Sequence, residues 1–240
     1  MAGHSKWANI KHKKERADAK KGKIFSRIVK EIISAVKMGG LDPKSNARLR
    51  LALQKAKDAN VPKDVVEKNV KKASSCDQTD YAEVLYELYG HGGVGVLVEA
   101  LTDNRNRTVS DLRIATHKRG GTIADTGAVA FNFDRRGILR LPKGDMSEDE
   151  LFLLATEAGA EDFEVTEEGC LIVTDPQELY AVKEQLDEKD VVVEEATIEM
   201  IPKMLIDCEE KTLQSNMALI EWIEALDDVD AVYHNMSSEG

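Results

Sequence analysis

The chain has 240 residues, of which 42% are hydrophobic and 32% are charged. This length allows two or three domains with their own cores, and the composition is that of a soluble globular protein. No run of about 18 apolar residues could span a bilayer, so we expect no membrane partner. The first residues lack the apolar stretch of a secretory signal, which predicts a cytoplasmic bacterial protein.

The net charge of −11 is divided unevenly along the chain. Residues 1–74 contain 20 Lys and Arg against 7 Asp and Glu, a net charge of +13. Residues 75–240 contain 13 against 37, a net charge of −24. Such an asymmetry is typical of a protein with a segment that faces nucleic acid or a membrane surface.

Patterns that indicate catalysis or metal binding are scarce. Cys76, Cys170 and Cys208 are far apart and form no C-x-x-C pair, which argues against a disulfide framework and against a zinc site. The sequence contains no H-E-x-x-H and no G-x-S-x-G. We therefore expect no enzyme activity, no catalytic residues, no metal and no cofactor. A nuclease built around Asp103 is the alternative that the sequence leaves open.

Residues 1–23 form a polar, basic leader without helical or strand periodicity. Lys and Arg neutralise phosphates and release counterions, and a ring such as Trp7 or His12 can stack on an unpaired base. We expect a partner to order this leader, and the alternative is a solvated tail without a partner. Its candidate nucleic-acid-binding residues are Lys6, Trp7, Lys11, His12, Lys13, Lys14, Arg16, Lys20, Lys21 and Lys23.

A small three-helix domain is expected to follow the leader. Apolar residues recur at helical spacing in residues 24–38. Asp42 and Pro43 are expected to be the N-cap and first residue of a second helix that Asn60 closes, and Pro62 opens a third. Their outer faces carry Lys and Arg that can follow phosphates. The alternative is a helix-turn-helix, against which stands the absence of Gly from the turn.

From residue 80 the apolar period becomes two, which is typical of strands. The expected elements are strands at 84–89 and 94–101, a helix at 108–118 and a strand at 128–133. The first two strands are joined by Gly90-His91-Gly92-Gly93. No Gly-Lys-Ser/Thr follows this glycine-rich segment, so it predicts a hairpin turn rather than a phosphate-binding loop.

Residues 137–203 contain a βαββαβ pattern, the ferredoxin-like signature. Ser147 and Glu150 fit a capping box, and Asp175 with Pro176 fits a second helix start. The expected elements are strands at 138–141, 163–166, 170–174 and 191–201, and helices at 147–158 and 175–187.

The remaining elements set the domain organisation. A helix at about 209–226 and a strand at 231–235 supply what the segment at 80–134 lacks. We expect an α+β chain with an N-terminal three-helix domain and two ferredoxin-like α/β domains, the third inserted in the second. The expected boundaries are 1–75, 80–134 plus 205–240, and 135–204. The alternative is a linear order with an appended C-terminal helix and strand.

The polar loop at residues 102–108 leaves a strand and enters a helix. Arg105 and Arg107 are two of the few bases in an acidic region, and free N–H groups at a helix N-terminus can hold a phosphate. Both are therefore candidate nucleic-acid-binding residues. The alternative is a capped turn with Thr108 as N-cap and Arg105 paired with a carboxylate.

Two segments resemble the signatures of a known family. The first 12 residues, Met-Ala-Gly-His-Ser-Lys-Trp-Ala-Asn-Ile-Lys-His, resemble the N-terminal signature of the YebC/PmpR family. Residues 89–93 and 99–108 resemble its second signature, and the likeness extends over essentially the whole chain. His91 is a departure, because the family usually has Pro there, and it affects the rigidity of the turn.

The resemblance implies a helical N-terminal domain and two α/β domains, the third inserted in the second. It implies a cytoplasmic bacterial transcriptional regulator that binds DNA. Relatives also act in translation: a mitochondrial member activates synthesis of a respiratory-chain subunit, and bacterial members associate with ribosomes and relieve stalling on proline-rich stretches. The family has no established catalytic residues.

Three functions remain as hypotheses. The first is a DNA-binding transcriptional regulator, and the second is a ribosome-associated translation factor that binds ribosomal RNA. The third is a protein-interaction adaptor whose acidic domains meet basic partners. We expect a monomer. The sequence does not choose between DNA and RNA and names no target gene or effector.

Overall fold

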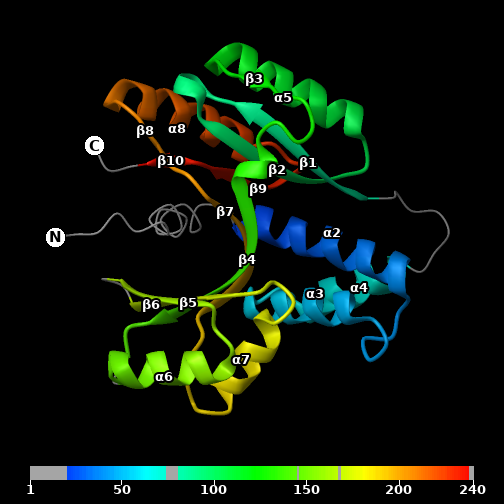
Figure 1. The fold of residues 1–240 in the computed structure, drawn as a ribbon. Helices are drawn as coiled ribbons and strands as arrows, with labels where there is room; N and C mark the ends of the chain where they lie inside the picture. The colour runs from blue at the N-terminus through cyan, green and yellow to red at the C-terminus, as the bar shows by residue number, and fades with distance from the viewer. Residues whose placement is uncertain (1–20, 74–80, 145, 167–168, 238–240) are drawn as a thin grey trace. The chain divides into compact units, whose positions relative to one another are not determined.

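The computed structural model describes residues 21–73, 81–144, 146–166 and 169–237. It shows an α+β fold in which helices precede two sheet-containing regions (Figure 1). The chain divides into two compact units, one of residues 1–130 and 204–240 and the other of residues 131–203. The second unit is thus an insertion between two segments of the first.

The first unit begins with the helices α2 (Lys21–Gly39), α3 (Ala47–Asp58) and α4 (Lys63–Ala73). Helices α3 and α4 both pack against α2. Their buried side chains include Ile28, Ile32 and Val36 from α2 and Leu49 and Ala56 from α3. Because apolar positions recur every three to four residues, each helix buries one stripe and leaves its charged side chains outside.

The second helix does not start where the sequence predicted. Asn46 rather than Asp42 is the N-cap of α3, and its side-chain oxygen accepts a hydrogen bond from the Leu49 backbone at 3.0 Å. The Asn46 amide also donates to the carbonyls of Ala35 and Gly40, both at 2.8 Å. These bonds reach back to the end of α2, which a local capping pattern does not show.

The rest of the first unit is an α/β domain made of two chain segments. Its elements are β1 (Ala82–Tyr89), the 3₁₀ turn η3 (His91–Gly93), β2 (Gly95–Thr102), α5 (Arg105–Arg119), β3 (Thr122–Ile123), the short parallel pair β8 (Ile206–Asp207) and β10 (Met236–Ser237), α8 (Glu210–Glu224) and β9 (Val229–His234). Four of the strands form an antiparallel sheet in the order β3-β1-β2-β9.

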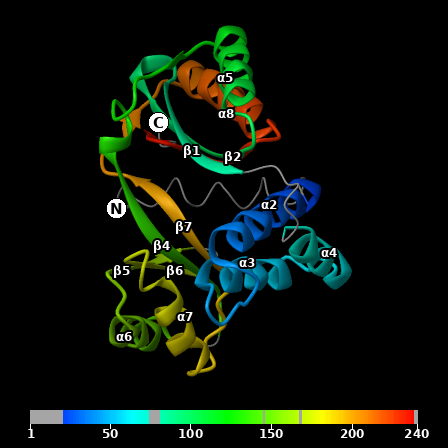
Figure 2. The ribbon, with the colours of Figure 1, turned by 90° about the vertical axis from the view of Figure 1, so that its right-hand side faces the viewer.

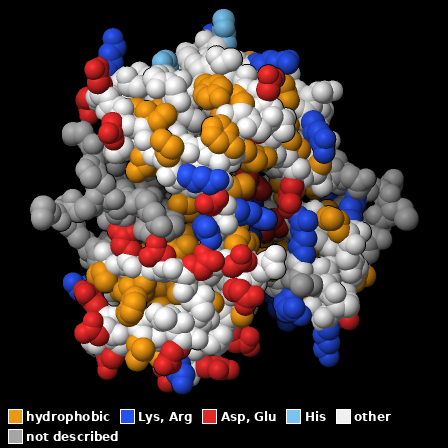
Figure 3. Space-filling model, viewed as in Figure 1, with side chains coloured by type: hydrophobic (Ala, Val, Ile, Leu, Met, Phe, Trp, Pro, Cys, Tyr) orange, Lys and Arg blue, Asp and Glu red, His pale blue; other side chains and the backbone are white. Residues whose placement is uncertain are grey.

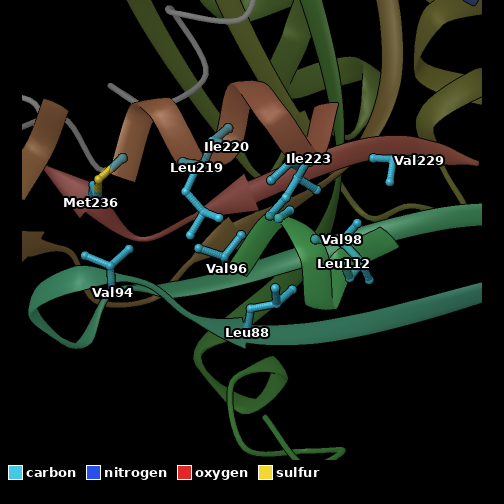
Figure 4. Close-up of a cluster of buried hydrophobic side chains, with 12 residues drawn as sticks. Leu88, Val94, Val96, Val98, Leu112, Leu219, Ile220, Ile223, Val229 and Met236 are labelled. Atoms are coloured by element: carbon cyan, nitrogen blue, oxygen red, sulfur yellow. The ribbon is translucent and has the colours of Figure 1, made fainter. Parts of the chain in front are cut away.

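Helices α5 and α8 cover one face of this sheet (Figures 1 and 2). Figure 4 shows Leu88, Val96 and Val98 of the strands directed toward Leu219 and Ile223 of α8. All five side chains are fully buried. This apolar core holds α5 in place with its other face exposed.

A strand expected at residues 128–133 is absent; the sheet instead takes its edge strand from β3 (Thr122–Ile123), and η4 (Ala130–Asn132) is a 3₁₀ turn. The cause is the buried carboxylate of Glu87, which accepts hydrogen bonds from the backbone N–H groups of Gly127, Val129 and Ala130 at 2.6–2.7 Å. Donors turned toward one carboxylate cannot pair with a neighbouring strand. The prediction of a strand there is wrong.

The second unit follows the predicted βαββαβ order. Its elements are β4 (Phe133–Pro142), α6 (Glu148–Ala158), β5 (Asp162–Thr166), β6 (Gly169–Thr174), α7 (Leu179–Asp187) and β7 (Glu195–Pro202). The strands are antiparallel in the order β5-β6-β4-β7. The first unit's sheet has the same spatial order if β2, β3, β1 and β9 are taken as the first, second, third and fourth strands. The two sheets therefore share the ferredoxin-like arrangement, although the strand that corresponds to the third position comes first in the chain of the first unit.

Local capping is predicted with mixed accuracy in the second unit. The capping box of Ser147 and Glu150 is confirmed, with reciprocal hydrogen bonds. Helix α7 begins at Leu179 after the N-cap Glu178, so the predicted start at Asp175 is too early. The final strand begins at Glu195 rather than at residue 191, because Val191 is held by the carbonyl of Leu186 at the end of α7.

Candidate nucleic-acid interface

The helical part of the first unit has a strongly basic surface. Residues 21–73 contain 14 Lys and Arg against 5 Asp and Glu. Ion pairs join Lys55 to Glu31 at 3.0 Å and Lys63 to Glu67 at 3.8 Å. The exposed cations of this region are Lys44, Arg50, Lys57, Lys63, Lys68, Lys71 and Lys72. Their number exceeds what five carboxylates can neutralise, so the surface attracts polyanions.

Most of the predicted leader residues lie outside the part of the chain that the structure describes. These are Lys6, Trp7, Lys11, His12, Lys13, Lys14, Arg16 and Lys20. Lys21 and Lys23 lie in the first turns of α2, and their side chains also fall outside the described part. Their contact with nucleic acid stays a prediction.

The loop before α5 is a capped turn. Asn104, not Thr108, is the N-cap, and its side-chain oxygen accepts a hydrogen bond from the Arg107 backbone at 3.1 Å. The Asn104 N–H donates to the Thr102 hydroxyl at 3.0 Å. The loop thus satisfies one of the N–H groups that a phosphate would need.

Arg107 is the arginine of this loop that is paired with carboxylates. Its guanidinium donates to Asp228 at 2.7–3.1 Å and to Asp103 at 2.7 Å. The alternative reading of the loop expected Arg105 in that role. Arg105 is instead exposed at the first position of α5. The structure therefore distinguishes the two predicted arginines: Arg107 is half-exposed and neutralised by carboxylates, whereas Arg105 is exposed at the start of α5.

Asp228 lies at the centre of a buried polar cluster. Its Oδ2 accepts hydrogen bonds from the hydroxyls of Thr102 and Thr108, both at 3.0 Å, beside those from Arg107. Burial acts to raise the pKa of Asp228, but these donors outweigh it, and the pKa is lowered. The carboxylate therefore stays charged and fixes the start of α5 against the start of β9.

Helix α2 reaches the same cluster. The Nζ of Lys30 donates to the carbonyls of Asp227 at 2.9 Å and Leu101 at 3.3 Å, and it lies 3.5 Å from Asp228 Oδ1. One turn earlier, Arg27 Nη1 donates to the carbonyl of Asp230 at 3.2 Å. Two cations of the basic helix are thus used inside the first unit and are not available to a ligand.

Sequence reasoning missed these structural residues. Asp228, Thr102 and Lys30 come from three separate segments, and each looks like an ordinary surface residue in its own segment. The surplus of charge on α5 is a signal that could have been read, since this helix holds five Lys and Arg against the single acid Asp111.

The second unit has the opposite surface. Residues 131–203 contain 7 Lys and Arg against 20 Asp and Glu. Figure 3 shows acidic side chains spread over the part of the view that contains α6, β5 and β6. An excess of carboxylates of this size repels phosphates.

The described residues offer little support for a cysteine pair, a metal site or a membrane span. Cys170 and Cys208 are free thiols, while Cys76 lies outside the described part. Within residues 21–73, 81–144, 146–166 and 169–237, no three His, Cys, Asp or Glu side chains cluster in a way that could hold a metal ion. No helix in these ranges has the length and hydropathy of a membrane span.

Comparison with known proteins identifies the family. Residues 81–236 match the second and third domain of TACO1/YebC proteins, and residues 5–75 match their N-terminal domain. The chain belongs to the TACO1/YebC family. The resemblance inferred from the two signature segments is confirmed.

Relatives from the chlamydial group of bacteria are similar over their full lengths. A probable transcriptional regulatory protein of Protochlamydia amoebophila is 64% identical over 98% of this chain and 96% of its own. One from Chlamydia pneumoniae is 56% identical over 99% and 100%. The names of these relatives support a role in regulation.

A solved structure supports the fold. The crystal structure of a conserved hypothetical protein from Aquifex aeolicus matches with a TM-score of 0.85 and 43% identity. The match covers 97% of each chain. The α+β architecture of this TACO1/YebC protein is therefore shared with the Aquifex aeolicus protein.

Proposed function

We propose that this TACO1/YebC protein regulates gene expression by binding nucleic-acid backbone through its leader and the exposed cations of α3, α4 and the loop before α3, with DNA as the first target. The observation that carries the proposal is the charge division. Residues 21–73 have 14 Lys and Arg against 5 acids, while residues 131–203 have 7 against 20. Counterion release from phosphates would supply most of the binding free energy. The proposal includes no catalytic step and no cofactor.

The names of the relatives favour DNA. Those from Protochlamydia and Chlamydia are named probable transcriptional regulatory proteins. A regulator of transcription acts on a promoter, directly or through a partner, and exposed Lys side chains such as Lys57 and Lys68 suit duplex phosphates. The proposal therefore takes promoter DNA as the physiological ligand.

RNA is the second candidate, and the surface of α4 supports it. The exposed polar side chains of α4 are Lys, Asp and Glu, and the amide of Asn69 donates to the Val65 carbonyl at 2.8 Å. Adenine in the major groove is read by Asn or Gln, and α4 exposes neither of them. Its four exposed Lys side chains can contact the phosphates of any nucleic acid, so this surface suits structured RNA, including ribosomal RNA, as well as DNA.

Crosslinking in cells tests the proposal. The protein is crosslinked at physiological salt, purified, and its attached nucleic acid is sequenced. Enrichment of promoter fragments supports the first candidate, and enrichment of ribosomal RNA with co-sedimentation on ribosomes supports the second. If the protein recovers no more DNA or RNA than an unrelated acidic control protein does, both candidates are contradicted, and an adaptor that binds basic proteins is favoured.

A pair of double variants tests the surface itself. Lys57→Ala with Lys68→Ala removes two exposed cations from the helical region, and Lys143→Ala with Lys189→Ala removes two from the acidic unit. The first pair should weaken duplex binding and flatten the log–log salt dependence by roughly two units. The second pair is matched in charge and should leave both unchanged. Equal effects of the two pairs contradict the proposed surface.

A further inference from the structure

The basic residues of the discontinuous α/β domain are concentrated on one helix. Residues 75–130 and 204–240 together contain six Lys and Arg against 17 Asp and Glu. Five of the six lie on α5, and all five are exposed: Arg105, Arg107, Arg113, Lys118 and Arg119. Chance placement over this acidic domain would spread them, so the helix has a surface charge that the domain as a whole lacks.

Structural roles explain only part of this set. Arg107 is neutralised by Asp228 and Asp103, and Arg119 lies over the ring of Trp222, 5.2 Å from its centroid. Cations in the last turn also complement the helix dipole. Arg113 lies in the middle of α5, where the dipole gives it no such role.

Arg113 borders a groove between α5 and the edge strand β3. The groove has a volume of about 790 Å³, and His117, Lys118 and Ile114 line it beside Arg113. Arg113 with His117 and Ile114 with Lys118 are i,i+4 pairs, so the four side chains share one face of the helix. Blue and pale blue side chains lie along the top edge of Figure 3, where Figure 1 places α5.

The groove combines cations with exposed apolar surface. Ile114 is 51% exposed, although it lies among polar and charged neighbours on a helix whose other face is buried. The carboxylate of Asp125 lines the opposite, β3 side. An anion would therefore bind toward Arg113 and Lys118, and a flat apolar group could cover Ile114 and the His117 ring.

We propose that this α5–β3 groove binds a single strand of nucleic acid, with phosphates on Arg113 and Lys118 and an unpaired base against Ile114. The proposal rests on the proposed function and adds a second contact surface to it. A duplex keeps its bases stacked inside and would leave Ile114 uncovered. A single strand can use both kinds of side chain at once.

Binding of labelled oligonucleotides to the full-length protein tests the proposal. The probes are a single strand of about 16 nucleotides, made as RNA and as DNA, and the corresponding DNA duplex. Arg113→Ala with Lys118→Ala should weaken single-strand binding about tenfold and flatten its log–log salt slope by roughly 1.4 units, at about 0.7 per phosphate. Ile114→Ala should weaken the single strand and leave the duplex unchanged. The RNA and DNA arms show whether the sugar matters.

The controls separate this proposal from the proposed function. Lys143→Ala with Lys189→Ala has the same charge change and should bind as the native protein does. If Lys57→Ala with Lys68→Ala weakens binding while the α5 pair does not, the groove proposal is wrong and the proposed function stands. The groove proposal is also wrong if the α5 variants lose binding to duplex and to single strand equally. If the native protein binds none of the probes, both proposals fail. Unchanged thermal midpoints of all variants exclude unfolding as the cause.

Discussion

Nε and Nη2 of Arg107, in the first turn of α5, both donate hydrogen bonds to the carboxylate of Asp228, one residue before β9. The two residues are 121 positions apart, and the inserted unit lies between them in the sequence. Asp228 is almost fully buried, with 6% of its side chain exposed, whereas 48% of Arg107 is exposed. The pair therefore joins the two chain segments of the discontinuous domain.

Replacement of Asp228 should destabilise the first unit. Asp228→Asn removes one acceptor oxygen and the charge from a site with two hydroxyl donors and a guanidinium. A buried donor left without its partner costs about 1–3 kcal/mol, and we expect a loss of that size in the free energy of unfolding. Urea denaturation measures it. Asp227→Asn is the matched control, because the Asp227 side chain is exposed, and it should change stability by less than about 0.5 kcal/mol. Equal losses in the two variants would show that the buried hydrogen bonds are not the cause.

Asp230 has the opposite electrostatic character. Burial raises its pKa to about 6, although Arg27 Nε lies 3.6 Å from its Oδ1 and acts to lower it. A raised pKa in the folded state favours the protonated acid. The contribution of Asp230 to stability is therefore fully present below about pH 4, its unfolded value, and is lost as the pH rises through about 6.

Asp230→Asn isolates this contribution. The difference in unfolding free energy between native protein and variant should shift in favour of the variant by roughly 1–3 kcal/mol between pH 4 and pH 7. Urea titrations at each pH measure that difference, in which the other titrating carboxylates cancel. A difference that is constant with pH, or that shifts in favour of the native protein, contradicts the raised pKa.

Glu87 should respond to acid in the other direction. Burial acts to raise its pKa, but hydrogen bonds from Gly127, Ala130 and Val129 outweigh it, and the pKa is lowered. Its stabilisation is present above the unfolded value of about 4.5 and is lost as the pH falls through the lower folded value. Glu87→Gln places an NH₂ donor against backbone donors and should lower stability by about 1–3 kcal/mol at pH 7.

Amide hydrogen exchange gives Glu87→Gln a local readout. Protection of the N–H groups of Gly127, Val129 and Ala130 should fall in the variant more than protection of strand β2 does. The control is Glu83→Gln on the same strand, where the carboxylate is 63% exposed. Retained protection at these three positions would mean that the loop is held by something other than Glu87.

The sequence predicted correctly those features of the fold that are determined by residues close together in the chain. The Ser147–Glu150 capping box spans three residues and was predicted, as were the helical stripes of α2 and α3. The strand expected at residues 128–133 has the right alternation, but Glu87, about 40 residues away, captures its N–H groups. Apolar periodicity reports the secondary-structure preference of a segment, but it gives no information about a hydrogen-bond acceptor that is distant in the sequence.

The candidate interface shows the same limit. Net charge by region was readable, because it needs only counting, and it indicated the helical region. The different roles of Arg107 and Arg105 could not be predicted, because they depend on Asp228, which lies beyond the inserted unit in the sequence. The groove residues Arg113, Ile114 and Lys118 were also missed, since Gly121–Asp125 completes the site after the helix turns back.

The leader can be tested by salt dependence in the intact protein. If about six phosphates are neutralised on duplex DNA, the slope of log affinity against log salt should be roughly −5. Lys13→Ala should flatten that slope by about one unit if Lys13 contacts a phosphate, because each lost contact retains about one counterion. Lys189→Ala, in the acidic unit, removes the same charge and should leave the slope unchanged. A slope near zero for the native protein would show that the leader does not act through phosphate contact. The same conclusion would follow if Lys13→Ala lowered the affinity but had the same slope as Lys189→Ala.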